Sequence, residues 1–368
     1  MNADFMQALN ELEKDRGIEK SILIDALEAA LSSAYKRNFG TSQNVEVDID
    51  SDTGEIHVYS LKEVVEDVYD SLLEISLEEA QDIDTFYNFG DFVRIEVTPK
   101  NFGRIAAQTA KQVVVQRIRE AERDLIFNEY TNRESDIVTG IVQRVNKNNV
   151  LIDLGKTEGI ILPSEQIPGE HYNQGDRIKV YLLEVKKTTK GPQVLLSRTH
   201  PGLVKRLFEL EVPEIHDGIV EVFNISREAG SRTKIAVFTN DAEVDPVGSC
   251  VGHKGTRVKA VVDELKGEKI DIVTWNEDIK TFISNSLSPA QVVLVDANEE
   301  SKSALVIVPD YQLSLAIGKE GQNARLAAKL TGWKIDIKSE SQFEASKEKS
   351  ALESEIILDV EESTVEEV

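Results

Sequence analysis

Two short glycine-flanked segments have residue types and a spacing that suit binding to the phosphate backbone of a nucleic acid. They read Gly252-His253-Lys254-Gly255 and Gly318-Lys319-Glu320-Gly321. Because glycine has no Cβ, a nucleic-acid backbone can approach the chain closely at either end of each segment. A helix-compatible stretch follows each segment, at 256–266 and 322–330. The unpaired N–H groups and positive dipole end of such a helix favour phosphate.

These segments belong to an internal repeat. Each follows a β-branched residue, Val251 or Ile317, and the strands at 267–272 and 332–337 both read Gly-x-Lys-Ile-Asp-Ile. The loops are offset by 66 residues and the strands by 65. Strand-like runs precede each loop, at 219–225 and 233–238 in the first copy and at 292–295 and 304–308 in the second. The order strand, strand, helix, Gly-x-x-Gly, helix, strand therefore occurs twice.

This order resembles the prokaryotic type of KH domain, which clamps about four nucleotides of single-stranded RNA at its Gly-x-x-Gly turn. We predict tandem KH domains at 200–277 and 278–340, with Cys250 as a small buried residue beneath the first loop. The alternative is that the glycines only separate two helices and that the lysines are ordinary solvated side chains. The regularity of the repeat disfavours it. The predicted RNA-binding residues are Gly252, His253, Lys254, Gly255, Arg257, Lys259, Gly318, Lys319, Glu320, Gly321, Gln322, Asn323 and Arg325.

A small barrel is predicted before the repeat, at 135–199. Strand patterns at 136–145, 150–154, 159–162, 177–185 and 193–197 alternate with turns, as in an OB-type barrel. Landmarks such as Asp153-Leu154-Gly155 resemble the S1-type RNA-binding barrel. Leu151 and Leu162 stand where such barrels usually carry stacking side chains. The barrel is either a weakly stacking RNA binder, through Lys186, Lys187 and Arg198, or mainly a spacer.

The first 130 residues combine helices and strands in an α/β domain. Apolar pairs recur every four residues from Ile22-Leu23 to Ala34-Tyr35, which predicts a helix with a wide apolar stripe. A hairpin is expected at 45–49 and 55–59, and another strand at 92–97. A basic helical stretch from Arg104 to about Tyr130 could form a connector roughly 40 Å long.

Three stretches of this domain resemble the N-terminal domain of the bacterial NusA family of transcription elongation and termination factors. They lie at 12–18, 98–108 and 117–120, and the resemblance continues in domain order to residue 338. It implies an N-terminal domain that docks on core RNA polymerase near the RNA exit channel. The barrel and KH domains would follow the single-stranded nascent transcript, affecting pausing, hairpin-dependent termination and antitermination, together with other elongation or antitermination factors.

On that basis we predict polymerase or exit-channel contacts at five basic positions: Lys100, Arg104, Lys111, Arg117 and Arg119. Residues 61–91 carry ten acids and one base, which suits a basic protein surface or an ordinary solvated helix face equally well. The tail, 341–368, carries nine acids and two bases and is predicted to be disordered. The overall expectation is an α+β multidomain protein.

Composition limits the remaining function classes. The net charge of −24 argues against a simple nucleic-acid binder, but residues 98–123 and 318–338 are locally basic. One cysteine excludes internal disulfides, and the histidines share no metal-ligand spacing. No phosphate-binding Gly-x-x-x-x-Gly-Lys-Ser/Thr loop and no tight acid cluster suggests an enzyme. We expect a cytoplasmic, monomeric, non-enzymatic protein without metal, cofactor or membrane span; an RNA-processing or ribosome-assembly factor is the alternative.

Overall fold

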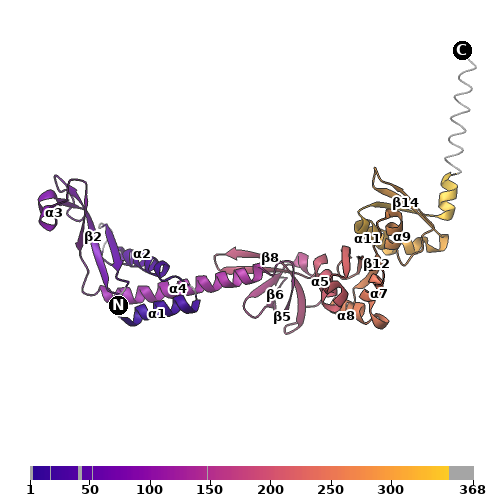
Figure 1. The fold of residues 1–368 in the computed structure, drawn as a ribbon, viewed down its shortest axis with the longest axis horizontal. Helices are drawn as coiled ribbons and strands as arrows, with labels where there is room; N and C mark the ends of the chain where they lie inside the picture. The colour runs from indigo at the N-terminus through magenta and orange to yellow at the C-terminus, as the bar shows by residue number, and fades with distance from the viewer. Residues whose placement is uncertain (1–2, 17, 40–43, 52, 147, 348–368) are drawn as a thin grey trace, which may run out of the picture. The chain divides into compact units, whose positions relative to one another are not determined.

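The computed structural model describes residues 3–16, 18–39, 44–51, 53–146 and 148–347. The chain forms two compact units that divide between Ile126 and Phe127. This division falls inside α4 (Phe102–Thr131), a single helix of 30 residues (Figure 1). The predicted connector helix is therefore present, and the predicted boundary at residue 130 lies close to its end. Among the described residues, no helix is both long and apolar enough to cross a membrane.

The first unit packs helices against a mixed sheet. Its elements before α4 are α1 (Ala3–Arg16), α2 (Lys20–Phe39), β1 (Val45–Ile49), β2 (Ile56–Val65), β3 (Glu74–Ser76), α3 (Leu77–Ile83) and β4 (Phe92–Glu96). Strand β2 pairs with β1 and β4 in antiparallel fashion and with β3 in parallel. The hairpin and the strand near residue 92 are thus confirmed, whereas β3 and α3 had no clear signal in the sequence.

The apolar stripe of α2 builds the main core of this unit. Leu23, Leu27 and Leu31 are fully buried, and the step of four residues places them on one helix face. They belong to one apolar cluster with Val47 of β1 and Phe102 of α4. The periodicity of the sequence therefore identified the buried face correctly.

The second unit begins with the barrel. Its strands are β5 (Ile137–Asn146), β6 (Asn149–Asp153), β7 (Glu158–Ile161), β8 (Arg177–Thr188) and β9 (Gly191–Ser197). They close in the order β5-β6-β7-β9-β8, with β7 and β9 as the parallel pair. The predicted closed barrel of short strands is confirmed, with strand ends that differ by a few residues.

The repeat folds as two copies of one module. The first contains β10 (Val220–Glu228), β11 (Arg232–Thr239), α7 (Pro246–Val251), α8 (Thr256–Glu264) and β12 (Lys269–Thr274). The second contains β13 (Leu294–Asn298), β14 (Ser303–Val308), α10 (Leu313–Ile317), α11 (Gln322–Thr331) and β15 (Lys334–Ser339). Each sheet joins an antiparallel to a parallel pair, with β11 or β14 in the middle. Cys250 is fully buried, as expected, and burial raises the pKa of its thiol to about 12.

Each module begins with helices that the sequence analysis did not identify. They are α5 (Pro201–Glu211) and α6 (Pro213–His216) in the first, and α9 (Ile279–Ser286) in the second. A short helix also occupies residues 340–347, where disorder was expected from residue 341. Ser339 starts it with a reciprocal cap: its Oγ accepts from Gln342 N–H, and its own N–H donates to Gln342 Oε1. Residues 348–368 of the predicted tail lie outside the described residues.

Candidate nucleic-acid interface

Both Gly-x-x-Gly loops adopt the same backbone. Gly252 and Gly318 have φ values of 73° and 76°, and the second variable residue of each loop is left-handed, with φ of 51° at Lys254 and 53° at Glu320. The helices that follow the loops, α8 and α11, have Gly255 and Gly321 as their N-cap residues, and no side chain caps their first turns. Each loop therefore presents a tight, uncapped helix start, which is the geometry expected for a phosphate contact.

The first glycine of each loop is required by close packing as well as by its φ angle. A Cβ at Gly252 would lie 2.7 Å from Arg257 Cγ, and a Cβ at Gly318 would lie 2.8 Å from the backbone nitrogen of Asn323. Arg257 and Asn323 are equivalent positions of the repeat. They hold the turn together in the same way, since each donates a hydrogen bond to a carbonyl of the helix before the loop.

Predicted contacts in the first loop separate into exposed and engaged side chains. His253, Lys254 and Lys259 are exposed. Arg257 is held by Glu214, with Nη1 2.9 Å from Oε2, and by the carbonyl of Ser249. The side chains of His253, Lys254 and Lys259 are therefore available to contact RNA, while Arg257 stabilises the loop.

In the second loop, Lys319 and Glu320 are exposed, and the next helix turn is tied to the first module. Arg325 Nε lies 2.6 Å from Glu228 Oε1, and Gln322 donates to Glu228 Oε2 at 2.8 Å. The hydrogen bond from Arg325 is the main reason why the pKa of Glu228 lies below its usual value. Arg325 and Gln322, which were predicted to bind RNA, thus already bind a carboxylate of the first module.

Buried polar contacts fix the two modules against each other. The Lys234 ammonium is fully buried, lies 3.0 Å from Asp271 Oδ2 and donates to the carbonyl of Ser288 in the second module. Asn224 of β10 donates to the carbonyl of Leu330 at the end of α11. The two modules are therefore held in a fixed relation, because separating a buried ammonium from its partners is costly.

The structure contradicts the prediction that Arg198 contacts RNA. Its side chain is fully buried where the barrel meets the first module, and it bonds both carboxylate oxygens of Glu170. It also bonds the Glu264 carboxylate and the carbonyls of Lys179 and Glu264. With its donors used inside the protein, Arg198 joins the barrel to the KH module and does not reach RNA.

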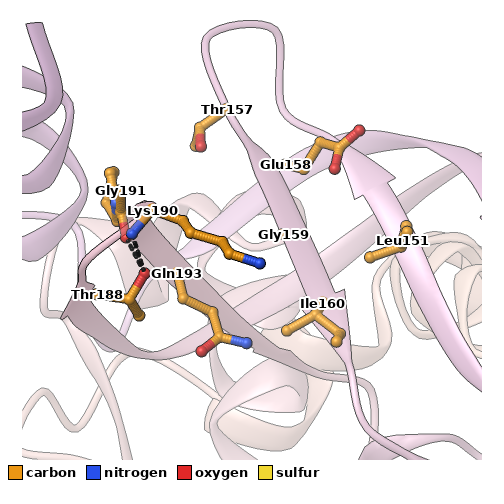
Figure 2. A pocket seen from close by; sticks show the side chains of 10 residues that line it. Leu151, Thr157, Glu158, Gly159, Ile160, Thr188, Lys190, Gly191 and Gln193 are labelled. Carbon is orange, nitrogen blue, oxygen red and sulfur yellow. Dashed lines mark hydrogen bonds between the residues drawn. The ribbon is translucent and has the colours of Figure 1, made fainter. Parts of the chain in front are cut away.

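The barrel has its own hollow, of about 550 Å³, between β6, β7 and the β8–β9 turn. The Lys190 side chain extends from the turn toward β7, and Leu151 lies on the other side (Figure 2). Thr188 Oγ1 donates to the carbonyl of Gly191 and shapes the turn. No aromatic side chain of a described residue lines this hollow. Leu151, which stands where S1-type barrels usually carry a stacking side chain, thus lies on the face of the barrel where a base would stack.

Restoring an aromatic side chain to this face tests whether it contacts bases. We expect Leu151→Phe to raise the affinity of the full chain for single-stranded RNA about fivefold, because base–aromatic stacking contributes about 1–3 kcal/mol. Fluorescence anisotropy with a labelled RNA measures the change. Leu210→Phe is the control, since Leu210 is exposed on α5 and does not line the hollow. Equal affinities for the two variants would assign the barrel to a spacer role.

The other predicted barrel lysines lie nearby on β8. Both Lys186 and Lys187 are exposed; Lys186 Nζ is 3.1 Å from Glu184 Oε2, and Lys187 Nζ lies 4.9 Å from the centre of the Phe127 ring. An ion pair this exposed is weak, so it can exchange for a phosphate at little cost.

The predicted polymerase contacts lie on or just before α4. Lys100, Arg104, Lys111 and Arg119 are exposed, and Arg117 is partly buried beside Glu120 at 3.0 Å. Spacings of seven and eight residues place Arg104, Lys111 and Arg119 on one face of α4, while Arg117 points elsewhere. The basic positions therefore form a stripe of three residues rather than a five-residue patch.

The acidic region 61–91 also exposes aromatic side chains, which the sequence analysis overlooked. Tyr69 and Phe86 are 89% and 85% exposed, and Phe89 and Phe92 are more than half exposed. Their position among closely spaced carboxylates in the sequence was the available signal. Aromatic side chains are enriched where proteins bind other proteins. Among the described residues, no group of His, Cys, Asp and Glu side chains could hold a metal ion.

Protein-family models match four consecutive parts of the chain. The NusA N-terminal domain matches residues 4–124, and the S1 RNA binding domain matches 132–197. The NusA-like first KH domain matches 198–275, and the NusA-like second KH domain matches 279–345. The matches follow the predicted domain order.

Curated relatives extend the similarity over the whole chain. The transcription termination/antitermination protein NusA of Halalkalibacterium halodurans is 60% identical over 375 residues, which cover all of this chain and 98% of that protein. The protein of the same name from Bacillus subtilis is 63% identical and covers 93% of this chain and 92% of its own length. The solution structure of the N-terminal domain of NusA from Bacillus subtilis is 63% identical over 33% of this chain and 99% of that chain, with a TM-score of 0.31.

Proposed function

The chain belongs to the NusA family of transcription termination/antitermination proteins, and we propose that it binds RNA polymerase through its first unit and the nascent transcript through its KH modules. Acting this way, it modulates pausing, hairpin-dependent termination and antitermination in the bacterial cytoplasm without catalysing a reaction, alongside other elongation or antitermination factors. The main support is the pair of matching, exposed loops, on two modules that buried contacts join. The relatives described above offer no support for RNA processing or ribosome assembly.

Polymerase binding is assigned to the first unit for two reasons. Its family match is to the NusA N-terminal domain rather than to an RNA-binding domain. Its surface combines the aromatics Tyr69 and Phe86 with acidic neighbours, and a separate basic stripe on α4. Aromatic side chains beside charge suit a protein partner, and the basic stripe suits the RNA that leaves the polymerase.

Overlapping fragments test this division of roles. Fragment 1–131 is expected to retain core RNA polymerase in a pull-down, and fragment 127–368 is expected to retain single-stranded RNA. The overlap matters because Phe127 and Tyr130 of α4 contact the barrel, through Lys187 and the carbonyl of Leu154. Full-length protein serves as the positive control for both ligands. Polymerase retained by 127–368 alone would contradict the assignment.

The full-length chain then distinguishes the two surfaces of the first unit. A Tyr69→Ser/Phe86→Ser variant is expected to lose polymerase and keep RNA, because only the aromatic surface is altered. Arg104→Glu/Lys111→Glu reverses charge on the α4 stripe and reports its contribution separately. Leu210→Ser, an exposed apolar residue outside this unit, is the matched control. Full polymerase retention by the aromatic variant would remove that surface from the interface.

A further inference from the structure

Three aromatic side chains form a partly exposed patch on the first KH module. Phe223 of β10 stacks on Trp275, which directly follows β12, with ring centroids 4.8 Å apart and planes at 25°. The ring of Phe238 in β11 lies 5.1 Å from the same indole, and the buried Phe282 of α9 meets Phe223 edge-on at 6.0 Å. The Phe223 side chain is 50% exposed. The aromatic patch of Phe223, Phe238 and Trp275 therefore presents a ring to solvent.

A β-bulge lies at the residue that carries the exposed ring. The pairing of β10 with β11 shifts register between Val222 and Asn224, so Phe223 is the extra residue without a cross-strand partner. The core-facing residues of β10 accordingly step by two from Val220 to Val222 and then by three to Ile225. Bulges re-aim side chains and are frequent next to functional sites. The strand thus departs from regular pairing where the patch is most exposed.

The aromatic patch and the second Gly-x-x-Gly loop lie at opposite ends of the same two strands. Strands β11 and β12 are parallel, and their pairing starts at Arg232 and Lys269. These two residues line a cavity beside the second loop, whereas Phe238 and Trp275 follow the last residue pair. At about 3.3 Å per residue, the two ends are roughly 20 Å apart. A ligand of the patch is therefore distinct from a phosphate at that loop.

The surroundings of the aromatic patch are acidic. Glu221 pairs with Phe238 across β10 and β11, which places both side chains on one face of the sheet. Glu221 and Glu277 are exposed, and neither takes part in an ion pair among the described residues. Five acids and one base occur in the three segments that carry the patch: 219–224, 238–243 and 275–281. This charge favours a cation over a phosphate.

Arginine is the cation that fits both features of the surface. Its planar guanidinium stacks on aromatic faces and also binds a carboxylate through a rigid set of donors. Lysine brings the same charge on a strongly hydrated ammonium without a flat face. An RNA base would also stack on the patch, but its phosphates would meet the local carboxylates. The observations therefore favour a basic protein segment as the occupant.

We propose that the aromatic patch binds an arginine-containing segment of a partner protein. The guanidinium stacks on the exposed ring of Phe223, and its N–H groups donate to the carboxylate of Glu221. This inference goes beyond the proposed RNA-binding function and does not depend on it. It gives the first KH module a protein-binding surface in addition to its Gly-x-x-Gly loop.

Two peptides of equal length and charge test the proposal, one alternating arginine with glycine and the other lysine with glycine. Because an acidic chain attracts any cation, the ratio of the two affinities is measured, by fluorescence anisotropy with labelled peptides. The full-length chain carries Tyr69→Ser/Phe86→Ser throughout, so that the aromatic surface of the first unit does not contribute. The arginine peptide is expected to bind about three- to fivefold more tightly than the lysine peptide.

Phe223→Ser is expected to abolish this preference for arginine. Tyr311→Ser is the matched control, because it removes an 80% exposed aromatic ring from the second module, and it should leave the preference intact. Phe223→Leu keeps an apolar side chain against Phe282 and removes only the ring. It should lose the preference as well, while urea unfolding stays close to that of the parent. A preference that survives both Phe223 substitutions would overturn the proposal.

The carboxylate is tested separately from the ring. Glu221→Gln is expected to lower the affinity for the arginine peptide about twofold, as for an exposed ion pair. Glu300→Gln is the charge-matched control, since Glu300 is exposed in the turn between β13 and β14. Equal affinities of the two variants would contradict the assigned contact with Glu221.

RNA titrations and sedimentation distinguish the other possible occupants. Phe223→Ser should bind single-stranded RNA as the parent does; a loss of RNA affinity in both Phe223 variants with no change in the peptide ratio would make the patch a base-stacking surface and overturn the proposal. A dimer that depends on Phe223, without an arginine preference, would assign the patch to a second copy of the chain. RNA binding that survives changes to both Gly-x-x-Gly loops would overturn the proposed function and leave this inference unaffected.

Discussion

Replacing the variable pairs of both Gly-x-x-Gly loops by Asp-Asp is expected to lower the affinity of the full chain for single-stranded RNA roughly a hundredfold, or about tenfold (1.4 kcal/mol) per loop. His253-Lys254 and Lys319-Glu320 are the pairs that change. Each replacement places carboxylates at an exposed turn beside an uncapped helix start, where a phosphate would bind. The repulsion should be strongest at low salt, because ions screen exposed charges.

The matched control for this experiment is Asn-Asn at the same four positions. Lys254 and Glu320 have left-handed backbones, and both Asn and Asp tolerate that conformation better than most residues. The two variants therefore differ in charge and not in fold, so Asn-Asn should lose much less affinity than Asp-Asp. Anisotropy titrations at two salt concentrations measure both. Equal affinity of the Asn and Asp variants would show that the loops do not contact the phosphate backbone.

The second large effect is expected on stability, at the ion pair between Arg227 and Glu268. Both side chains are fully buried, and the Glu268 carboxylate accepts from Arg227 Nε and Nη2, each at 2.9 Å, and from Thr233 Oγ1 and Gly230 N–H. Arg227→Met leaves that carboxylate buried and uncompensated. We expect the free energy of unfolding of this region to fall by about 3–5 kcal/mol.

Tryptophan fluorescence during urea unfolding reads out this change. The only tryptophans of the chain, Trp275 and Trp333, lie in the first and second KH modules respectively. Arg206→Met is the control, because Arg206 is 39% exposed beside Glu209 and an exposed pair contributes at most about 1 kcal/mol. Adding Glu268→Gln to Arg227→Met should recover part of the loss. If the free energy of unfolding falls no further than in Arg206→Met, groups other than Arg227 stabilise the buried Glu268 carboxylate.

The same pair predicts a pH dependence. Burial by itself raises the pKa of the Glu268 carboxyl, but the hydrogen bond and charge of Arg227 outweigh burial, and the pKa lies below the ordinary 4.5. A carboxyl with a lowered pKa in the folded state stabilises the protein fully above its unfolded pKa. That contribution is therefore lost as the pH falls below about 4.5 toward and through the folded pKa. The double variant should lack this component of the acid dependence.

The Arg227–Glu268 pair also supports the junction between the barrel and the KH modules. Arg227 Nη1 donates to the carbonyl of His200, where the barrel ends, and Glu268 holds the β10–β11 turn through Gly230. That turn carries Glu228 and Ser231, which bond the second module. Weakening the pair should therefore loosen the contact between the two modules as well as the first module itself.

Local features of this protein were determined by the sequence itself. Glycines at 252 and 318 require left-handed φ angles, and the leucines of α2 recur with the helical period, so both patterns act over a few residues. The repeat identified both KH modules for the same reason. The cap at Ser339 was also local, in the pattern Ser-x-x-Gln, but it lay within an acidic stretch that favoured a prediction of disorder.

Only the tertiary structure decided which basic residues are free to bind RNA. Arg198 and Arg325 resemble Lys254 and Lys319 in sequence, yet Arg198 is buried against Glu170 and Glu264, and Arg325 is paired with Glu228, 97 residues away. Pairing over such distances depends on how the domains pack, which local spacing does not encode. The same packing brings Lys269 beside the second loop. The two Gly-x-x-Gly loops were thus visible in the sequence, whereas the side chains available around them were set by the contacts between domains.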